Sequence, residues 1–246
     1  MGKKKMISDA GDIARVVNRQ GFLPFFASDI PDFSLEEITP PQLWFPDDEK
    51  DFMGVWDWKS DVIIEGDCAY GKFVMNKACF ISMKCFPHFI NYRRGSAHLN
   101  EAEKTMLGVL AEHHSLLSGE LKKLCGYVDP PRKRIGNRIE RAVVQANRDV
   151  LSKQDKRSRL KSEFERAITR LQMAGYVVIA DFEYKHDRYG KRYGWGMARY
   201  CTAEDFFGAE RLEVNCPPNE SGEWLLEYLS QKLPHLSQAE IMKVIG

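Results

Sequence analysis

Five basic side chains crowd into the eight residues from 185 to 192, where the only acidic residue is Asp187. Four aromatic residues lie in or beside the same segment. The basic residues are Lys185, His186, Arg188, Lys191 and Arg192, and the aromatic residues are Tyr184, Tyr189, Tyr193 and Trp195. Long cationic side chains neutralise phosphates, while aromatic rings pack on sugars or stack on exposed bases. These residue types favour contact with a nucleic-acid backbone.

A two-stranded hairpin is predicted for residues 175–200, because Gly190 supplies the positive φ that a short bulged turn requires. The preceding segment, 159–173, has apolar residues at helical spacing and ends just before Gly175, a typical C-cap. Basic residues lie off the apolar stripe of this predicted helix and extend the cationic character of the hairpin tip. They are Arg159, Lys161, Arg166 and Arg170.

Two shorter helices are predicted upstream, one at the capping box of Asn100 and Glu103 and one beginning at Ser118. Three helices followed by a two-stranded β wing is the order of a winged helix, a helix-turn-helix variant whose third helix enters the major groove. We therefore predict an α+β protein whose winged-helix unit, residues 100–208, binds double-stranded DNA through the basic residues above. A basic insert at 130–158 separates the second predicted helix from the third.

The N-terminal region, residues 1–99, is predicted to be mixed helix and strand and to pack against the winged-helix unit. Helices are expected at 8–20 and 52–66, and a β-hairpin is expected from Cys68 to Ser82. Residues 209–246 are expected to form a helical tail, with short helices around Trp224 and Ile241.

Aromatic and charged residues of the N-terminal region form a candidate pocket for an extruded base. The rings that could stack on the base are Trp56, Trp58, Tyr70 and Tyr92. The carboxylates that could act in catalysis are Asp57, Asp61, Glu65 and Asp67, and Asp57 and Glu65 are the preferred candidates among them. Arg93 and Arg94 could bind a phosphate. Closely spaced tryptophans are more often part of a core, and acids at helix ends are more often solvated. No catalytic residue is assigned on this basis.

Composition narrows the class of protein. The chain of 246 residues has a formal net charge of +1, yet residues 132–170 carry 13 Lys/Arg against 5 Asp/Glu, which can focus an anionic partner on one face. No apolar run approaches the roughly 18 residues of a membrane span, and the N-terminus does not resemble a signal peptide. Six scattered cysteines suit reduced thiols, so a cytoplasmic protein is expected.

Metal and cofactor sites are not expected. Cys85 and His88, with Cys68 and Cys79, lack the paired C-x-x-C spacing of a zinc site. No phosphate-binding glycine loop or nucleophile motif is present in the sequence.

Several strings resemble one family: GFLPFF, IPDFSLEE, CAYGKF, FPHFINYRR, HHSLLSGELK and, above all, the stretch from Ile168 to Gly208. Over about residues 8–208 the chain resembles the bacterial AlkZ-related proteins, relatives of the AlkZ-type winged-helix DNA glycosylases. The resemblance implies a winged-helix fold and DNA affinity. The parent glycosylases excise alkylated or crosslinked bases with a Gln-apolar-Gln triplet that positions water. No two glutamines of this chain are separated by one residue, so that catalytic triplet is absent.

Three functions follow from these observations. The first is a DNA-binding protein related to base-excision glycosylases and without catalysis or with weak catalysis. The second is a DNA glycosylase in which carboxylates replace the glutamine triplet. The third is a winged-helix module that binds another protein. Salt-dependent DNA binding separates the first two from the third, since counterion release makes affinity fall as salt rises.

Overall fold

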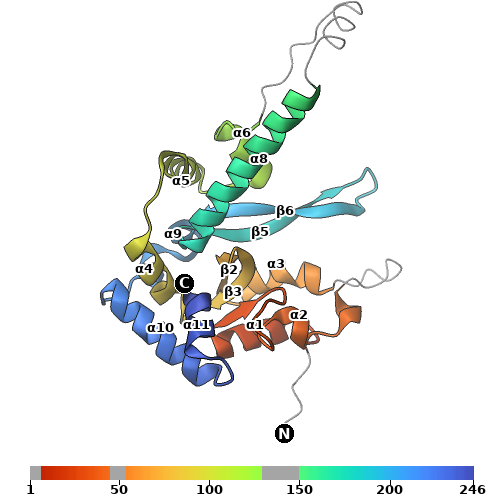
Figure 1. Ribbon diagram of the computed structural model, residues 1–246. Coiled ribbons are helices and arrows are strands. Elements are labelled where there is room, and N and C mark those ends of the chain that lie inside the picture. The colour runs from red at the N-terminus through yellow and green to blue at the C-terminus, as the bar shows by residue number, and fades with distance from the viewer. Residues whose placement is uncertain (1–6, 45–53, 129–149) are drawn as a thin grey trace, which may run out of the picture.

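The computed structural model of the protein describes residues 7–44, 54–128 and 150–246. It is a mixed α+β structure with two small antiparallel sheets, which lie between helices above and below them (Figure 1). The predicted α+β class is therefore confirmed. Most of the predicted basic insert at 130–158 falls on residues 129–149, which lie outside the described residues.

The first sheet forms from the N-terminal part of the chain in the order β1-β3-β2. The predicted hairpin is confirmed, because β2 (Cys68–Val74) and β3 (Lys77–Ser82) are joined by Met75 and Asn76, both with positive φ. The apolar segment after the first helix adds a short strand, β1 (Phe22–Pro24), which pairs antiparallel with β3. Its three residues all face buried surroundings, so no alternation marks the segment as a strand.

Helices cover this sheet. The predicted helices at 8–20 and 52–66 are confirmed, and Asp9 caps the first by accepting a hydrogen bond from the backbone N–H of Asp12. The aromatic segment FPHFINYRR, for which no helix was predicted, is helical because Pro87 stands in its first turn and its phenylalanines are buried. The helices are α1 (Ala10–Gln20), α2 (Leu35–Ile38), α3 (Val55–Glu65) and α4 (Phe86–Ser96), with a 3₁₀ turn at Pro41–Leu43.

The second sheet, in the order β4-β6-β5, belongs to the following part of the chain. Its elements are α5 (Glu101–His113), β4 (Ser115–Leu117), α6 (Ser118–Leu124), α8 (Val150–Met173), β5 (Val177–His186), β6 (Arg192–Thr202) and α9 (Ala203–Phe207). The capping box of Asn100 and Glu103 is confirmed, as is the positive φ of Gly175 just after α8. Helix α8 begins well before the predicted start at 159, because the polar stretch 152–158 continues the helix. Strand β4 was not predicted.

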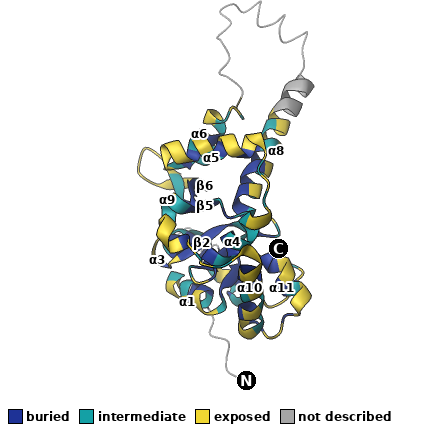
Figure 2. Cartoon of the chain, turned by 90° about the vertical axis from the view of Figure 1, so that its left-hand side faces the viewer, coloured by how far each residue is buried: buried dark blue, intermediate teal, exposed yellow. Residues whose placement is uncertain are grey.

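Helix α8 joins the two sheets. The side chain of Gln172 is fully buried; its Oε1 accepts a hydrogen bond from the backbone N–H of Lys72 in β2 at 3.0 Å, and its Nε2 donates to the carbonyl of Ile168. A single apolar cluster includes Tyr70 of β2 and Leu171 of α8. Buried residues accordingly line the inner faces of the helices and both sheets, and exposed residues lie outside (Figure 2).

The chain end returns to the first sheet. Helices α10 (Pro218–Lys232) and α11 (Gln238–Ile245) confirm the helical tail. The imidazole of His88 in α4 stacks on the indole of Trp224 in α10, with ring centroids 4.1 Å apart. Gly222 allows close approach, because a Cβ there would lie 2.7 Å from the ring of Tyr92. The tail therefore packs on α4 rather than extending freely.

Candidate nucleic-acid interface

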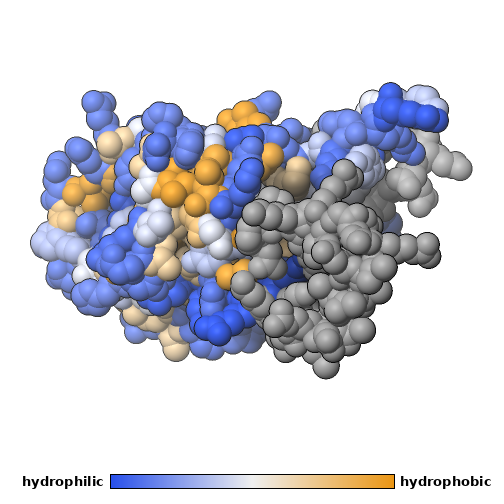
Figure 3. All heavy atoms as spheres, turned by 90° about the horizontal axis from the view of Figure 1, so that it is seen from above, coloured by the Kyte–Doolittle hydropathy of each residue, from blue (hydrophilic) through white to orange (hydrophobic). Residues whose placement is uncertain are grey.

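The β5–β6 hairpin projects from the body of the molecule (Figure 1). Every residue from 185 to 195 is exposed. Seen from above, the end of the molecule toward which the hairpin extends is hydrophilic (Figure 3). Asp187 shapes the turn: its Oδ1 accepts hydrogen bonds from the backbone N–H groups of Tyr189 at 2.8 Å and Lys191 at 2.9 Å. Gly190 takes the predicted positive φ of 80°.

The hairpin cations differ in their partners. Among the described residues, Lys185, Arg188 and Lys191 form no ion pair, whereas Arg192 pairs with Asp57 of α3. The guanidinium of Arg188 lies over its neighbour's ring, 4.6 Å from the centroid of Tyr189. Three cations in or beside one turn thus remain available for an external anion, because the only carboxylate there, that of Asp187, accepts hydrogen bonds from the backbone.

The basic residues of α8 are also exposed. Arg159, Arg166 and Arg170 are spaced seven and four residues apart, so they share one stripe of the helix, and Lys161 lies off that stripe. Two members of the stripe have acidic partners: Arg159 Nε lies 2.8 Å from Glu163, and Arg170 Nε lies 3.0 Å from Glu103. Arg166 is the member without an ion pair among the described residues.

Replacing Arg170 with alanine should lower the free energy of unfolding by about 1–3 kcal/mol, because the fully buried Glu103 carboxylate loses its cationic partner. The Arg166→Ala variant is the matched control and should change stability by less than about 0.5 kcal/mol. Urea unfolding followed by circular dichroism measures both. Equal stabilities of the two variants would contradict a structural role for Arg170.

The candidate pocket residues of the N-terminal region do not line one cavity. Trp58 and Tyr70 lie in the core, with exposures of 7% and 5%. Tyr92 packs against Gly222 of α10, and Arg93 donates a hydrogen bond to the carbonyl of Phe73 at 3.3 Å. Three acidic candidates lie apart from these residues: Glu65 is exposed at the end of α3, Asp67 pairs with Arg211 on the surface, and Asp61 is partly buried on α3.

Trp56 and Asp57 instead face the hairpin. The phenol of Tyr184 in β5 donates a hydrogen bond to Asp57 Oδ1 at 3.2 Å, and the guanidinium of Arg192 in β6 pairs with the same oxygen. Arg192 also lies 3.6 Å from the centroid of the Tyr184 ring. Burial, reinforced by the Asp57 charge, raises the pKa of Tyr184 to about 12, so its proton stays in place at neutral pH. These contacts hold the hairpin on α3 close to its turn, where His186 pairs with Arg192.

Lys59 is a residue of this junction that the sequence analysis missed. Its side chain is buried between two rings: Nζ lies 3.5 Å from the centroid of Trp56 and 4.2 Å from that of Phe182. Burial lowers the pKa of the Lys59 ammonium from 10.5 to about 8; the Asp57 charge opposes this shift and the Arg192 charge adds to it. In the sequence, a buried lysine between aromatic residues of a helix looks the same as a lysine that is exposed to solvent.

Replacing Lys59 with methionine should raise the free energy of unfolding near pH 7 by about 1–3 kcal/mol, because a lowered folded-state pKa means that the buried charge opposes folding. The penalty is fully present below about pH 8 and disappears as the pH rises to 10.5, where the unfolded chain also loses the proton. Urea unfolding of both proteins across this interval should show the gain shrinking. A gain that does not change with pH would contradict the lowered pKa.

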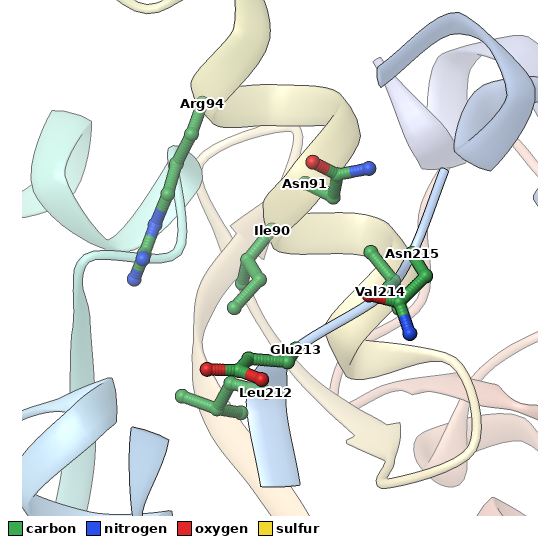
Figure 4. Close-up of a pocket in the computed structure, with 7 residues that line it drawn as sticks. All are labelled: Ile90, Asn91, Arg94, Leu212, Glu213, Val214 and Asn215. Atoms are coloured by element: carbon green, nitrogen blue, oxygen red, sulfur yellow. The ribbon is translucent and has the colours of Figure 1, made fainter. Parts of the chain in front are cut away.

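A surface cavity of about 290 Å³ lies elsewhere, between α4 and the segment that precedes α10 (Figure 4). Two polar side chains that line it, Arg94 and Asn91, are already engaged. Arg94 pairs with Glu204 and donates to the carbonyl of Gly175 at 2.8 Å, while Asn91 donates to the carbonyl of Cys216 at 3.0 Å. The Arg94 guanidinium therefore holds the chain together here, and the cavity lies apart from the hairpin.

The described residues also bear on metal binding and on membrane insertion. No group of three or more His, Cys, Asp or Glu side chains there is placed to hold a metal ion. Cys68 and Cys79 are buried in the first sheet, and burial raises the pKa of the Cys68 thiol to about 12. In the part of the chain that the structure describes, no helix combines the length and apolar character of a membrane span.

A family model described as AlkZ related matches residues 7–246. No curated protein and no solved structure matches the chain.

Proposed function

The chain belongs to the AlkZ-related family, and from this premise we propose that it binds double-stranded DNA through a winged-helix unit at residues 100–208. Residues 1–99 and 209–246 would support that unit. The proposed activity is binding without base excision. A DNA-binding protein whose six cysteines are free is expected in the cytoplasm.

The order of elements supports the winged-helix assignment. Helix α5, strand β4 and helices α6 and α8 precede the β5–β6 hairpin, and β4 pairs with β6 to close a three-stranded sheet. In this arrangement α8 is the third helix, whose exposed stripe would face the major groove, and the hairpin is the wing, which would contact the backbone.

The observation that carries the proposal is the set of unpaired cations on the wing. Lys185, Arg188 and Lys191 project together from the body, and none has an acidic partner among the described residues. Like charges gathered at one tip repel one another, and a phosphate backbone relieves that repulsion. Arg166 of α8 adds a further cation that has no ion pair within the part of the chain that the structure describes.

Base excision is the second candidate function, and one observation favours it. Asp61 of α3 lies on the side of the helix that faces the wing, and its pKa is raised by burial and by the charges of Glu65, Asp181 and Asp57. A raised pKa lets a carboxyl group keep its proton to a higher pH, which favours a role as general acid. We rank this function second because Asp57 is occupied by Tyr184 and Arg192 and because the glutamine triplet is absent.

One experiment tests both functions: binding and base release are measured on undamaged, abasic, alkylated and crosslinked duplexes over a series of salt concentrations. We expect the protein to bind all of these duplexes and to release no base. The plot of log affinity against log salt concentration should have a slope of about −3 or steeper. Absence of binding at low salt would overturn the DNA-binding proposal and favour a protein-interaction module. Base release from any lesion would replace it with the second candidate.

A further inference from the structure

Trp195 lies in an irregular part of the wing. Lys185 of β5 pairs with Tyr193 of β6, and Glu183 pairs with Met197, so the single residue Tyr184 faces three residues of β6. These three residues are Gly194, Trp195 and Gly196. A bulge of this kind redirects a side chain out of the regular alternation of a strand.

Both glycines are required by this geometry. Gly194 has a φ of 75°, in the left-handed region that other residues rarely adopt. At Gly196 a Cβ atom would lie 2.8 Å from the ring of Tyr184. Two positions that favour glycine therefore flank one tryptophan, and the bulge directs its indole outward.

The indole of Trp195 is directed largely into solvent. The residue is 70% exposed, and its ring meets the ring of Trp56 at 75° with centroids 5.3 Å apart. Trp56 is itself held in place by Lys59 below its ring. Trp195 thus rests against a fixed neighbour while most of its surface remains uncovered. Exposing so large an apolar ring gains little for the fold, since burial is what makes tryptophan stabilising.

The charge around Trp195 indicates what would cover it. Lys185, Arg188 and Lys191 lie at the same end of the wing, and Tyr193 is also exposed at 53%. A partner surface must therefore be anionic and also carry a flat ring. In matched duplex DNA the base faces are stacked on one another, so only an unpaired base offers such a ring next to phosphates.

We propose that Trp195 is a stacking platform for an unpaired DNA base, so that the protein prefers duplexes containing an extrahelical base over fully paired ones. This inference rests on the proposed DNA-binding function and names the form of DNA that the wing recognises. The wing cations would hold the phosphates on either side of the unpaired base, and the indole would receive the base itself.

The test compares binding to a matched duplex and to the same duplex with one extrahelical thymine. Wild-type protein should bind the second about five- to a hundredfold more tightly. Trp195→Ala should abolish this preference and leave affinity for the matched duplex within about twofold, while Trp195→Phe should retain most of the preference. Gly194→Ala, which keeps the indole but strains the bulge, should also lose it.

Met242→Ala is the control, because Met242 is an apolar residue of α11 with 41% exposure and no place in the proposed site. It should retain the wild-type preference. Thermal melting of each variant reports folding. A Trp195→Ala variant that keeps the preference, or that weakens both complexes equally, would overturn the inference. Wild-type protein that binds both duplexes equally would overturn it while leaving DNA binding intact, and wild-type protein that binds neither would overturn both proposals.

Discussion

Changing Lys185, Arg188 and Lys191 together to alanine should lower the affinity for every duplex by about a hundredfold or more at 0.1 M salt. Each phosphate contact contributes a log–log salt slope of about 0.9, so three lost contacts reduce the slope by about three units. Because long cations on a turn contact phosphates rather than base edges, the loss should not depend on sequence. A titration of binding against salt for wild type and variant measures the slope directly.

Two choices make this experiment specific. Arg192 is left unchanged, since its pairing with Asp57 anchors the wing on α3 and its removal would alter the position of the wing. The matched control removes three exposed lysines from the first sheet and the tail helices, namely Lys77, Lys232 and Lys243. It has the same change in net charge and should leave the salt slope nearly unchanged. Identical slopes for the wing variant and wild type would exclude the wing as a DNA contact.

Local signals in the sequence predicted the elements of this fold well. The capping box at Asn100 and Glu103, the glycine after α8 and the turn at Gly190 all act within a few residues, so the residues themselves specify the backbone. The same holds for the hairpin of the first sheet. The hairpin β5–β6 and the helix α8 that precedes it were both among the predicted elements.

The features that the sequence did not predict are those that depend on contacts between residues far apart in the chain. Strands β1 and β4 have three residues each, too few to show alternation, and they become strands only because β3 and β6 lie beside them. Helix α8 extends through the polar stretch 152–158, which has no apolar stripe to reveal it. Arg170 has the sequence pattern of a free surface cation, and only the packing of α5 against α8 brings the buried Glu103 to it.

The contacts between α3 and the proposed wing are likewise long-range contacts that the local sequence does not reveal. Asp57 and Arg192 are 135 residues apart, so nothing in the local sequence pairs them. Trp56 and Asp57 were expected in a pocket with Trp58 and Tyr70. Trp58 of α3 and Tyr70 of β2 are instead buried in the core, whereas Trp56 and Asp57 of α3 contact the hairpin. Aromatic content indicates that rings are available, whereas the fold decides which ring faces solvent. Trp195 is one of the rings that face solvent, and a glycine stands on either side of it in β6.

Replacing Phe164 with alanine should lower the free energy of unfolding by about 3–5 kcal/mol, a large share of the stability of a typical domain. Phe164 is fully buried in the centre of α8. The ring of Tyr127 meets it edge-on with centroids 5.5 Å apart, and Lys122 Nζ lies 4.6 Å above its centroid. Truncation would leave a cavity and remove both ring contacts, neither of which alanine can replace.

Urea unfolding measures the loss, and Phe26→Ala provides the same chemical change at a site that is 39% exposed, where less than half the effect is expected. Because α8 contacts β2 through Gln172 as well as the second sheet, the Phe164→Ala variant should unfold in one transition at lower urea rather than in two. A loss no larger than that of Phe26→Ala would mean that α8 does not depend on this core for its position. The core could then not be what holds the exposed arginine stripe of α8 in place for DNA binding.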